Sequence, residues 1–365
     1  MSRIRVGVVL GGRSGEHEVS LESARSVMAA LDPAKYEVIP IGIDRDGTWL
    51  LGGDPLGLLA GSSSAAEAER GLTAPSTGNA MLAISGHSTG EAGRAIDIVM
   101  PILHGPYGED GTIQGLLEMA DIPYVGSGVL GSAAAMDKGV MKAVFAGAGL
   151  PMAGHRLVTG REWRADREAL VAELATTPGL PLFVKPANLG SSVGITKVHD
   201  RAGIAPAMDL AAGFGRRIVV EESIEDAREI ECAVLGNDEP EVSVCGEVFA
   251  AGEFYDYASK YEDAASSTKA PADLPAELSD SIRAMAIRAF KALDCSGLAR
   301  VDFLVRRSDE AIFIIEANTM PGFTQISMYP QLWEASGLPY PRLLDRLIEL
   351  GFERHAEQAA LRSDR

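Results

Sequence analysis

The chain has 365 residues, of which 46% are hydrophobic, so it can bury a large core and is long enough for two or three domains. Its 51 acidic and 33 basic residues give a formal charge of −18, which disfavours binding to nucleic acid or to a membrane surface and favours a small-molecule substrate. No apolar run approaches the ~20 residues of a membrane span, and no signal-peptide pattern opens the chain, so we expect a cytoplasmic protein.

The N-terminal region predicts a parallel α/β unit. Strand, helix and strand in that order imply a right-handed crossover, with any ligand near the carboxyl ends of the strands. The elements that we expect are strands over 4–10, 38–43 and 96–103, a Gly-rich loop over 11–15, and helices with an apolar face from Leu21 to Leu31 and from about Thr112.

The first loop, GGRSGEHE, is a candidate ligand loop. Its glycines do not follow the GxGxxG order, and Asp44 lies further away than the acidic residue of a dinucleotide site, which disfavours an NAD-dependent oxidoreductase. Glu16 and Glu18 stand where an anion would be received, so the loop suits an ammonium group better than a pyrophosphate. The alternative is that these carboxylates only stabilise the first turn of the helix through its dipole.

A second loop with phosphate-binding character lies in PLFVKPANLGSSVGITKV. Two short apolar runs flank Gly190, Ser191 and Ser192, which predicts a hairpin lid. Backbone N–H groups and serine hydroxyls in such a loop can cradle phosphate oxygens, and Lys185 on the first strand can reach them as a point charge. A Walker A pattern is absent, and the alternative for Lys185 is an ordinary surface lysine.

The segment GLARVDFLVRRSDEAIFIIEAN predicts a hairpin with a metal site. If the loop centres near Asp309, Asp302 faces Glu316, Arg300 faces Asn318, and alternation sends all four to one face. Facing carboxylates require a cation between them, and an oxygen-rich set suits Mg²⁺. The alternative is a structural salt bridge, with Arg300 as the cation, on a solvated sheet face.

Eight motifs follow one another over nearly the whole chain: GGRSGEHEVSLESA, HGPYGEDGTIQGLLE, PYVGSGVLGSAAAMDK, VKPANLGSSVG, REIECAVLG, FYDYASKY, LARVDF and EANTMPGFTQISMYP. In this order they resemble the signatures of the D-alanine–D-alanine ligases of the ATP-grasp superfamily. The resemblance implies an α/β ATP-grasp fold with a Rossmann-like, parallel-sheet N-terminal domain (1–131), a central lid domain (132–220) and a C-terminal α+β domain (221–365). It also implies ATP-dependent joining of two D-alanines for peptidoglycan precursors.

The resemblance assigns the cofactor sites residue by residue. Two Mg²⁺ or Mn²⁺ ions would bind Asp302, Glu316 and Asn318, between the ATP phosphates. Glu221 or Glu222, with Ile224, would lie along the adenine, and Glu229 would bind the ribose; which of the two adjacent glutamates faces the base stays open. The residues that would contact or cover the phosphates are Lys138, Lys185, Ser191, Ser192 and Lys260.

The substrate residues also follow from the resemblance. Glu16 would bind the ammonium of the first D-alanine, and Arg300 with the N–H of Gly322 would stabilise the oxyanion of a tetrahedral intermediate. The remaining assignments are Ser327 and Met328 to the second carboxylate, Ser191 and Tyr261 to the closure of the lid, and His104 to the neighbourhood of the first substrate.

Competing functions are distinguished by a few residues. A D-alanine–D-lactate ligase is disfavoured by Tyr261, because FYDYASKY keeps the pattern of the dipeptide ligases. A nucleotide-binding regulatory protein with a dead site is disfavoured by the intact metal residues, Lys185 and Arg300. The family also implies a homodimer with D-alanine and ATP as its small-molecule partners.

Overall fold

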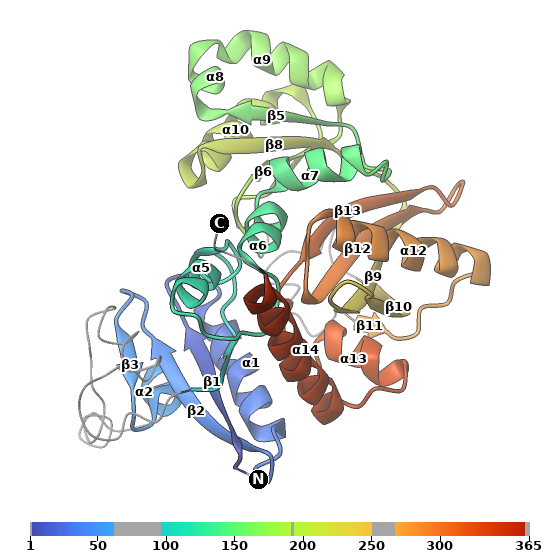
Figure 1. Cartoon of the computed structure of the whole chain (residues 1–365). Coiled ribbons are helices and arrows are strands. Elements are labelled where there is room, and N and C mark those ends of the chain that lie inside the picture. Colours follow the sequence, from blue (N-terminus) through green and yellow to red (C-terminus); the bar gives the residue numbers. More distant parts are fainter. Residues whose placement is uncertain (1, 62–95, 191–192, 250–266, 362–365) are drawn as a thin grey trace.

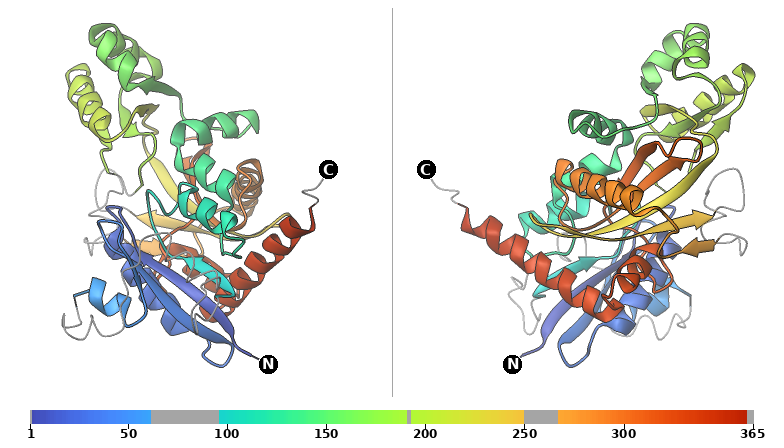
Figure 2. Two further views of the ribbon diagram at one scale, coloured as in Figure 1. Left: turned by 60° about the vertical axis from the view of Figure 1, so that its left-hand side comes forward. Right: turned by 90° about the vertical axis from the view of Figure 1, so that its right-hand side faces the viewer.

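The computed structural model describes residues 2–61, 96–190, 193–249 and 267–361, and within them the chain forms three sheets. The middle sheet stands at one end of the molecule and the N-terminal sheet at the other, with the C-terminal sheet beside both (Figures 1 and 2). Four predicted site residues, Ser191, Ser192, Lys260 and Tyr261, lie outside the described residues.

The N-terminal sheet has the strand order β3-β2-β1-β4, and β1, β2 and β4 are parallel, as predicted. β3 pairs antiparallel at the edge. Strand β4 is shorter than expected, since residues either side of Ile98–Pro101 leave the ladder. The elements of this region are β1 (Ile4–Gly11), α1 (His17–Ala30), β2 (Tyr36–Ile43), β3 (Trp49–Leu51), α2 (Pro55–Leu59), β4 (Ile98–Pro101), α5 (Thr112–Met119) and α6 (Val129–Met136).

Helix α1 buries the predicted apolar face, but it also buries two serines that the apolar pattern does not reveal. The Ser20 hydroxyl accepts a hydrogen bond from the Gly11 N–H (2.8 Å) and donates to the carbonyl of Ile102. Because these groups belong to the ends of β1 and β4, Ser20 fixes the start of α1 against the carboxyl edge of the sheet. A ligand site at this edge is the position that parallel topology favours.

The middle sheet has the order β5-β8-β6-β7, with antiparallel neighbours throughout. The predicted lid hairpin is confirmed, with Leu182 opposite Val198, although its second strand begins at Thr196 and not at Val193. The elements here are α7 (Lys138–Gly147), β5 (His155–Thr159), α8 (Gly160–Ala165), α9 (Arg167–Leu174), the π-helical turn η1 (Ala175–Gly179), β6 (Leu182–Pro186), β7 (Thr196–Val198), α10 (Arg201–Phe214) and β8 (Arg217–Glu222).

The C-terminal sheet has the order β11-β10-β9-β12-β13. Its β12–β13 hairpin has the predicted register at the polar end, with Arg300 opposite Asn318 and Asp302 opposite Glu316. The elements are β9 (Ala227–Gly236), β10 (Glu241–Phe249), β11 (Ser267–Lys269), α12 (Ala276–Ala292), β12 (Gly297–Arg306), β13 (Ile312–Asn318), α13 (Met328–Ala335) and α14 (Tyr340–Ala360).

The two faces of the C-terminal sheet pack against different partners. One face carries Phe303 and Val301 into a core with α12 and α7. The other carries Leu298 and Leu235 toward α13 and α14, in a core that continues into the N-terminal sheet. Figure 1 shows α14 running between the two sheets. Since α14 contacts β4, β9 and β12, it holds the C-terminal sheet against the N-terminal one.

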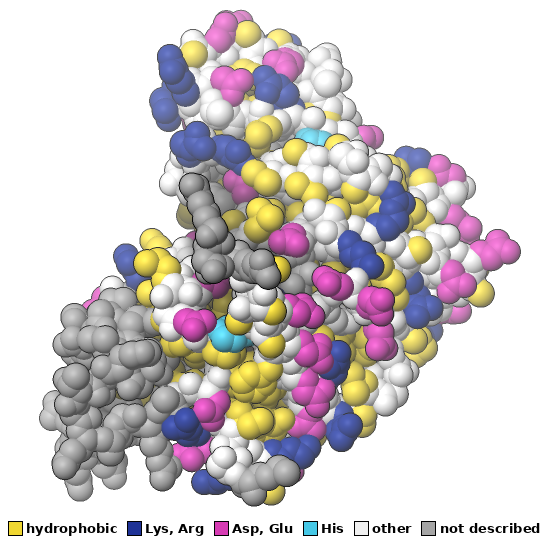
Figure 3. Space-filling view, in the orientation of Figure 1, with side chains coloured by type: hydrophobic (Ala, Val, Ile, Leu, Met, Phe, Trp, Pro, Cys, Tyr) yellow, Lys and Arg dark blue, Asp and Glu magenta, His cyan; other side chains and the backbone are white. Residues whose placement is uncertain are grey.

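The surface reflects the acidic composition. In the space-filling view, Asp and Glu side chains gather over the middle of the face that contains α14, where Glu349 and Glu353 are exposed (Figure 3). Among the helices in the described ranges, none combines the length and the apolar character that a membrane crossing requires.

Candidate active site

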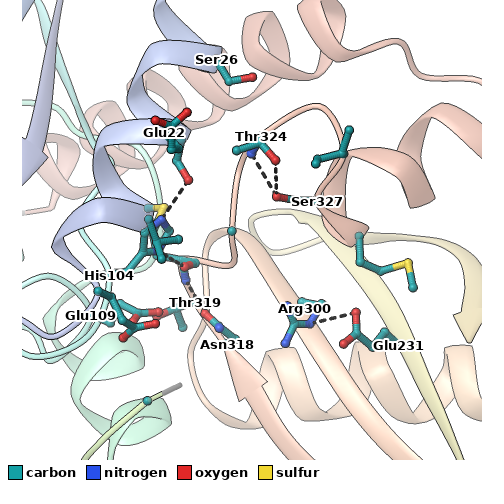
Figure 4. Close-up of a pocket in the computed structure, with 18 of the residues that line it drawn as sticks. Glu22, Ser26, His104, Glu109, Glu231, Arg300, Asn318, Thr319, Thr324 and Ser327 are labelled. Atoms are coloured by element: carbon teal, nitrogen blue, oxygen red, sulfur yellow. Dashed lines mark hydrogen bonds and ion pairs between the residues drawn. The ribbon is translucent and has the colours of Figure 1, made fainter. Parts of the chain in front are cut away.

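A cavity of about 840 Å³ opens where loops from the three sheets meet. Its walls come from the start of α1, the end of β4, the start of α7, the lid loop at Leu189 and Gly190, and the segment from β13 to α13 (Figure 4). Parallel topology accounts for Glu16 and His104, which follow β1 and β4 at the carboxyl edge of the N-terminal sheet, while the other walls come from the packing of the antiparallel sheets against that edge. The predicted site residues that line it are Glu16, His104, Lys138, Arg300, Glu316, Asn318, Gly322, Ser327 and Met328.

Glu16 precedes the first turn of α1 and its carboxylate lies between two glycines of other loops. A Cβ atom built on Gly105 would stand 2.7 Å from Glu16 Oε2, and one on Gly190 would stand 3.0 Å from it. The lid loop therefore reaches the N-terminal loop, and glycine is required where they meet. Glu18 instead turns outward, where it pairs with Arg45 at 2.6 Å. Both acidic residues of this loop line the cavity, but Glu16 is the one whose carboxylate lies beside Gly190.

The charged end of the hairpin is buried at Asp302 and partly buried at Arg300, Glu316 and Asn318. Asp302 is 4% exposed, and Arg300 donates to both of its oxygens, from Nε at 2.8 Å and from Nη2 at 2.7 Å. Lys138 Nζ lies 3.2 Å from the Glu316 carboxylate. The cations that facing carboxylates require are thus Arg300 and Lys138 in this structure. A salt bridge is present, as the alternative interpretation expected, but on a face that lines the cavity and not on an open sheet surface.

These residues fit a hard divalent cation by their chemistry. Carboxylates of Asp302 and Glu316 and the amide of Asn318 supply oxygen donors from one sheet face, and hard cations such as Mg²⁺ take oxygen ligands. The described residues contain no group of three or more His, Cys, Asp or Glu placed to hold a metal ion. Two carboxylates and an amide correspond to the pattern of Mg²⁺ sites in which substrate phosphates and water complete the shell.

A second charged cluster lies beside the cavity, on the middle sheet and α7. The Glu221 carboxylate pairs with Lys185 Nζ at 2.9 Å and with Lys142 Nζ at 2.5 Å. Burial alone would raise the pKa of Glu221, but the two ammonium groups outweigh it, so the pKa is lowered and Glu221 is ionised. Glu222 is exposed, so Glu221 is the member of this pair that points inward.

Sequence reasoning missed Lys142, which is 2% exposed. It lies four residues after Lys138 on the same helix, and this i, i+4 spacing was the available signal. The remaining nucleotide candidates, Ile224 and Glu229, are half-buried. Neither they nor the Lys185–Glu221 pair line the 840 Å³ cavity. The cavity brings together the substrate candidates with Glu316 and Asn318, and Asp302 lies behind it, paired with Arg300.

His104 is 3% exposed and lies in a hydrogen-bond network. Its Nδ1 is 2.9 Å from the carbonyl of Met320 and its Nε2 is 3.2 Å from the Ser23 hydroxyl. Burial lowers the pKa of His104, so the ring is neutral: Nδ1–H donates to the carbonyl, and Nε2 accepts from Ser23. The Ser23 oxygen also accepts from the N–H of Phe323 at 3.3 Å. This network anchors the loop that carries Gly322.

The same loop is braced at its other end. Ser327 precedes α13, and its hydroxyl oxygen accepts from the Thr324 N–H at 3.1 Å, while Ser26 of α1 accepts from the Gln325 N–H at 3.2 Å. The Ser327 hydroxyl lies 3.3 Å from where a Cβ on Gly322 would stand. Ser23 and Ser26 occupy one face of α1, so the helix that begins beside Glu16 also positions Gly322 and Ser327.

Glu109 is a further cavity residue that sequence reasoning did not single out. Its carboxylate is 8% exposed and accepts a hydrogen bond from the Gly105 N–H at 2.5 Å. Burial, and then the nearby charge of Glu16, raise the pKa of Glu109 well above its ordinary value. The signal was its place in HGPYGEDG, directly after a strand end.

The three sheets, the lid hairpin and the carboxylate hairpin define an ATP-grasp ligase. Residues 5–127 match the family model described as "D-ala D-ala ligase N-terminus", and residues 144–349 match "D-ala D-ala ligase C-terminus". The chain belongs to the D-alanine–D-alanine ligase family.

Relatives and solved structures agree over nearly the full length. The chain is 49% identical to the D-alanine–D-alanine ligase of Geobacillus thermodenitrificans, covering 98% of this chain and 97% of that protein, and 47% identical to that of Heliobacterium modesticaldum, covering 98% and 97%. It is similar to the solved D-alanine–D-alanine ligase of Coxiella burnetii (36% identity, TM-score 0.80, covering 98% and 97%) and to the VanG D-Ala:D-Ser ligase of Enterococcus faecalis (36%, 0.82, covering 96% and 100%).

Proposed function

We propose that this protein joins two D-alanines to D-alanyl-D-alanine for peptidoglycan precursors, with ATP converted to ADP and phosphate through a D-alanyl phosphate intermediate. The observation that carries the proposal is the convergence of Glu16, Arg300, Gly322 and Glu316 on one cavity. An anion for the substrate ammonium, a cation and an N–H for an oxyanion, and carboxylates for metal ions are the groups that this reaction requires.

The first step activates a carboxylate. Glu16 binds the ammonium of the first D-alanine, because its carboxylate faces the cavity between Gly105 and Gly190. The carboxylate of that alanine attacks the γ-phosphorus of ATP, and ADP leaves. Two Mg²⁺ or Mn²⁺ ions held by Asp302, Glu316 and Asn318 would neutralise phosphate charge in this step. Lys138, which already lies against Glu316, is placed to contact the phosphates.

The second step forms the peptide bond. The amine of the second D-alanine attacks the carbonyl carbon of the acylphosphate, and the developing oxyanion is stabilised by Arg300 and the Gly322 N–H. The nitrogen gives up its extra proton and the C–O bond to phosphate breaks, so that the amide and inorganic phosphate are formed. The carboxylate of the second D-alanine binds the Ser327 hydroxyl and the Met328 N–H, because these residues begin α13 and the first N–H groups of a helix have no intrahelical partner and carry the positive end of its dipole.

The adenosine part of ATP would lie between the middle and C-terminal sheets. Lys185 binds phosphate, Glu221 with Ile224 follows the adenine edge, and Glu229 takes the ribose. The burial of Glu221 and the exposure of Glu222 support the choice of Glu221 for the adenine. The roles predicted for Ser191, Ser192, Lys260 and Tyr261 in lid closure stay predictions. Closure would exclude water, which hydrolyses an acylphosphate.

We also propose the division into an N-terminal domain (1–131), a lid domain (132–220) and a C-terminal domain (221–365). The three separate sheets support it, although the second boundary falls within β8. A homodimer stays a prediction from the resemblance, and light scattering of the purified chain would measure it.

The function is tested by phosphate release from Mg²⁺·ATP, with products identified by mass. D-Alanine alone should support turnover and yield the dipeptide, whereas L-alanine should not. Mixtures with D-serine or D-lactate matter because one similar solved structure is a D-Ala:D-Ser ligase. If D-alanyl-D-serine or the lactate ester dominates at equal concentrations and neutral pH, the second-substrate assignment is wrong. If ATP binds without turnover, the protein is instead the nucleotide-binding regulatory protein with an inactive site.

A further inference from the structure

Glu231 is a buried carboxylate within the motif REIECAVLG to which neither the resemblance nor the proposed mechanism assigns a role. It is 3% exposed and lies on β9 directly opposite Asp302 of β12, which in turn lies opposite Glu316 of β13. Three adjacent strands therefore carry a row of carboxylates, Glu231, Asp302 and Glu316, on one face. A buried carboxylate is costly unless a positive charge or hydrogen-bond donors compensate it.

The compensating group for Glu231 is Arg300. The Glu231 Oε2 atom lies 3.2 Å from Arg300 Nε, the same nitrogen that donates to Asp302 Oδ1 at 2.8 Å. Figure 4 shows the side chains of Arg300 and Glu231 directed toward each other from neighbouring strands. On the other side of Glu231, its partner on β10 is Gly246. The side chains of Met328 and Leu332 occupy the space where a side chain at Gly246 would lie. The apolar flank favours the orientation of Glu231 toward the arginine.

The proposed function places two demands on Asp302 that conflict. Both of its oxygens now accept hydrogen bonds from Arg300. A divalent cation bound by Asp302 would compete for the same oxygens and repel the guanidinium. Arg300 must nevertheless stay at the reacting carbonyl, buried and charged, which requires a second anionic partner.

We propose that Glu231 is the positioning residue that retains Arg300 when Asp302 turns to the metal ion. Arg300 then changes its principal partner from Asp302 to Glu231 across adjacent strands, without leaving the sheet face. The inference rests on the proposed function for the role of Arg300, but the partner change itself is a property of the site and is measurable without turnover.

The variant Glu231→Gln removes the charge and keeps the shape. We expect Mn²⁺ affinity, measured by electron paramagnetic resonance with a non-hydrolysable ATP analogue and no D-alanine, to fall by roughly tenfold to a hundredfold, the range for residues that support metal ligands. In turnover, kcat should fall by a similar factor while the KM for D-alanine changes little, because Glu231 acts through Arg300 and not on the substrate.

Two controls separate positioning from other effects. Glu247→Gln breaks another buried pair of the same sheet, in which Arg228 donates to Glu247 at 2.8 and 2.6 Å, and should leave Mn²⁺ affinity unchanged. The second control is the double variant Glu231→Gln/Arg300→Gln. If Glu231 acts through Arg300, the double variant should have the same Mn²⁺ affinity as the single variant Arg300→Gln.

The outcomes decide between distinct accounts. If Glu231→Gln weakens Mn²⁺ binding equally with and without Arg300, Glu231 acts only as a nearby negative charge and the proposal is wrong. If Mn²⁺ affinity is unchanged in the single variant, the proposal is also overturned. If Mn²⁺ affinity falls as expected but the native protein joins no D-alanine, the proposed function fails and the partner change stands. If Glu231→Gln does not fold, Glu231→Asp is used instead, because its shorter side chain moves the carboxylate away from Arg300. The same Mn²⁺ affinity and kinetic constants are then measured.

Discussion

The two faces of the C-terminal sheet use neighbouring residues for opposite purposes. Asp302 and Phe303 are adjacent in β12 and both are buried, but Asp302 pairs with Arg300 on the face whose Arg300 and Glu316 line the cavity, whereas Phe303 lies in the core beneath α12. One face gains stability from apolar burial, at roughly 25 cal/mol per Å². The other holds carboxylates and an arginine, and buried ion pairs of this kind are often no more stabilising than apolar replacements. The cavity face is therefore built for chemistry and the α12 face for stability.

The largest effect should come from Asp302→Asn on the cavity face. We expect kcat to fall by about a hundredfold or more with modest loss of ATP affinity, because a metal carboxylate is lost while the other nucleotide contacts remain. Steady-state kinetics and nucleotide titration measure the two effects separately. A loss of ATP binding as large as the loss of kcat would contradict the role assigned to Asp302.

On the opposite face, Phe303→Ala should cost about 3–5 kcal/mol of unfolding free energy, since a fully buried ring is removed. Phe303→Leu, the matched control, should cost clearly less, because fewer buried atoms are removed and the cavity left is smaller. Denaturant titration gives both values. In the leucine variant kcat per folded molecule should stay near that of the native protein; a collapse of kcat there would show that the two faces are not separable.

At the edge of the cavity, Glu16→Gln should raise the KM for the first D-alanine by about tenfold to a hundredfold with a small change in kcat, since a charge-assisted hydrogen bond to the ground state is weakened. Glu18→Gln is the control, because the Glu18 carboxylate lies at the exposed rim of the cavity and pairs with Arg45. Equal effects of the two variants would remove Glu16 from the substrate site.

The buried carboxylate of Glu109, on the cavity side, should make the stability of the protein depend on pH. Its pKa in the folded protein lies well above the ordinary 4.5, so its contribution to stability is fully present below pH 4.5 and is lost as pH rises through the folded pKa. Glu109→Gln lacks this titration. The melting temperature of the variant should therefore gain on that of the native protein as pH rises, in scans at a series of pH values. A constant difference would mean that the pKa is not raised.

The smallest effect is expected at the hairpin tip. Asp309 accepts from Arg306 at 2.9 and 2.7 Å, but in an exposed position, where such pairs contribute little. Asp309→Asn should leave the denaturation midpoint and kcat within experimental error of the native values. A clear loss of activity would show that the tip contributes to the site.

The register of the β12–β13 hairpin was predictable at its polar end, which carries the candidate metal residues. Alternation and a polar break place Asp302 opposite Glu316, as the structure shows. Beyond that pair a bulge shifts the ladder, so that Phe303 lies opposite Ile314. A bulge adds one residue without changing the apolar pattern of either strand, which is why the sequence does not reveal it.

Residues that depend on pairing between distant segments were not predictable. Glu231 joins the row only because β9 lies next to β12, an order that no local pattern dictates. Ser23 contacts His104 and Phe323 only because the fold brings three distant segments of the chain together, which no local sequence pattern indicates. Residues within one motif, such as Glu16, or in one hairpin, such as Arg300 and Asp302, were within reach because short-range periodicity fixes their neighbours.

The central claim is that the reaction passes through an acylphosphate. It is tested most directly by following the transfer of oxygen from the D-alanine carboxylate to phosphate. D-Alanine labelled with ¹⁸O in its carboxylate is turned over with unlabelled ATP, and the released phosphate is analysed by mass. If the carboxylate attacks the γ-phosphorus and its C–O bond later breaks, each phosphate carries one ¹⁸O. Unlabelled phosphate accompanying dipeptide formation would contradict the mechanism, because the alanine would then have been activated by another route.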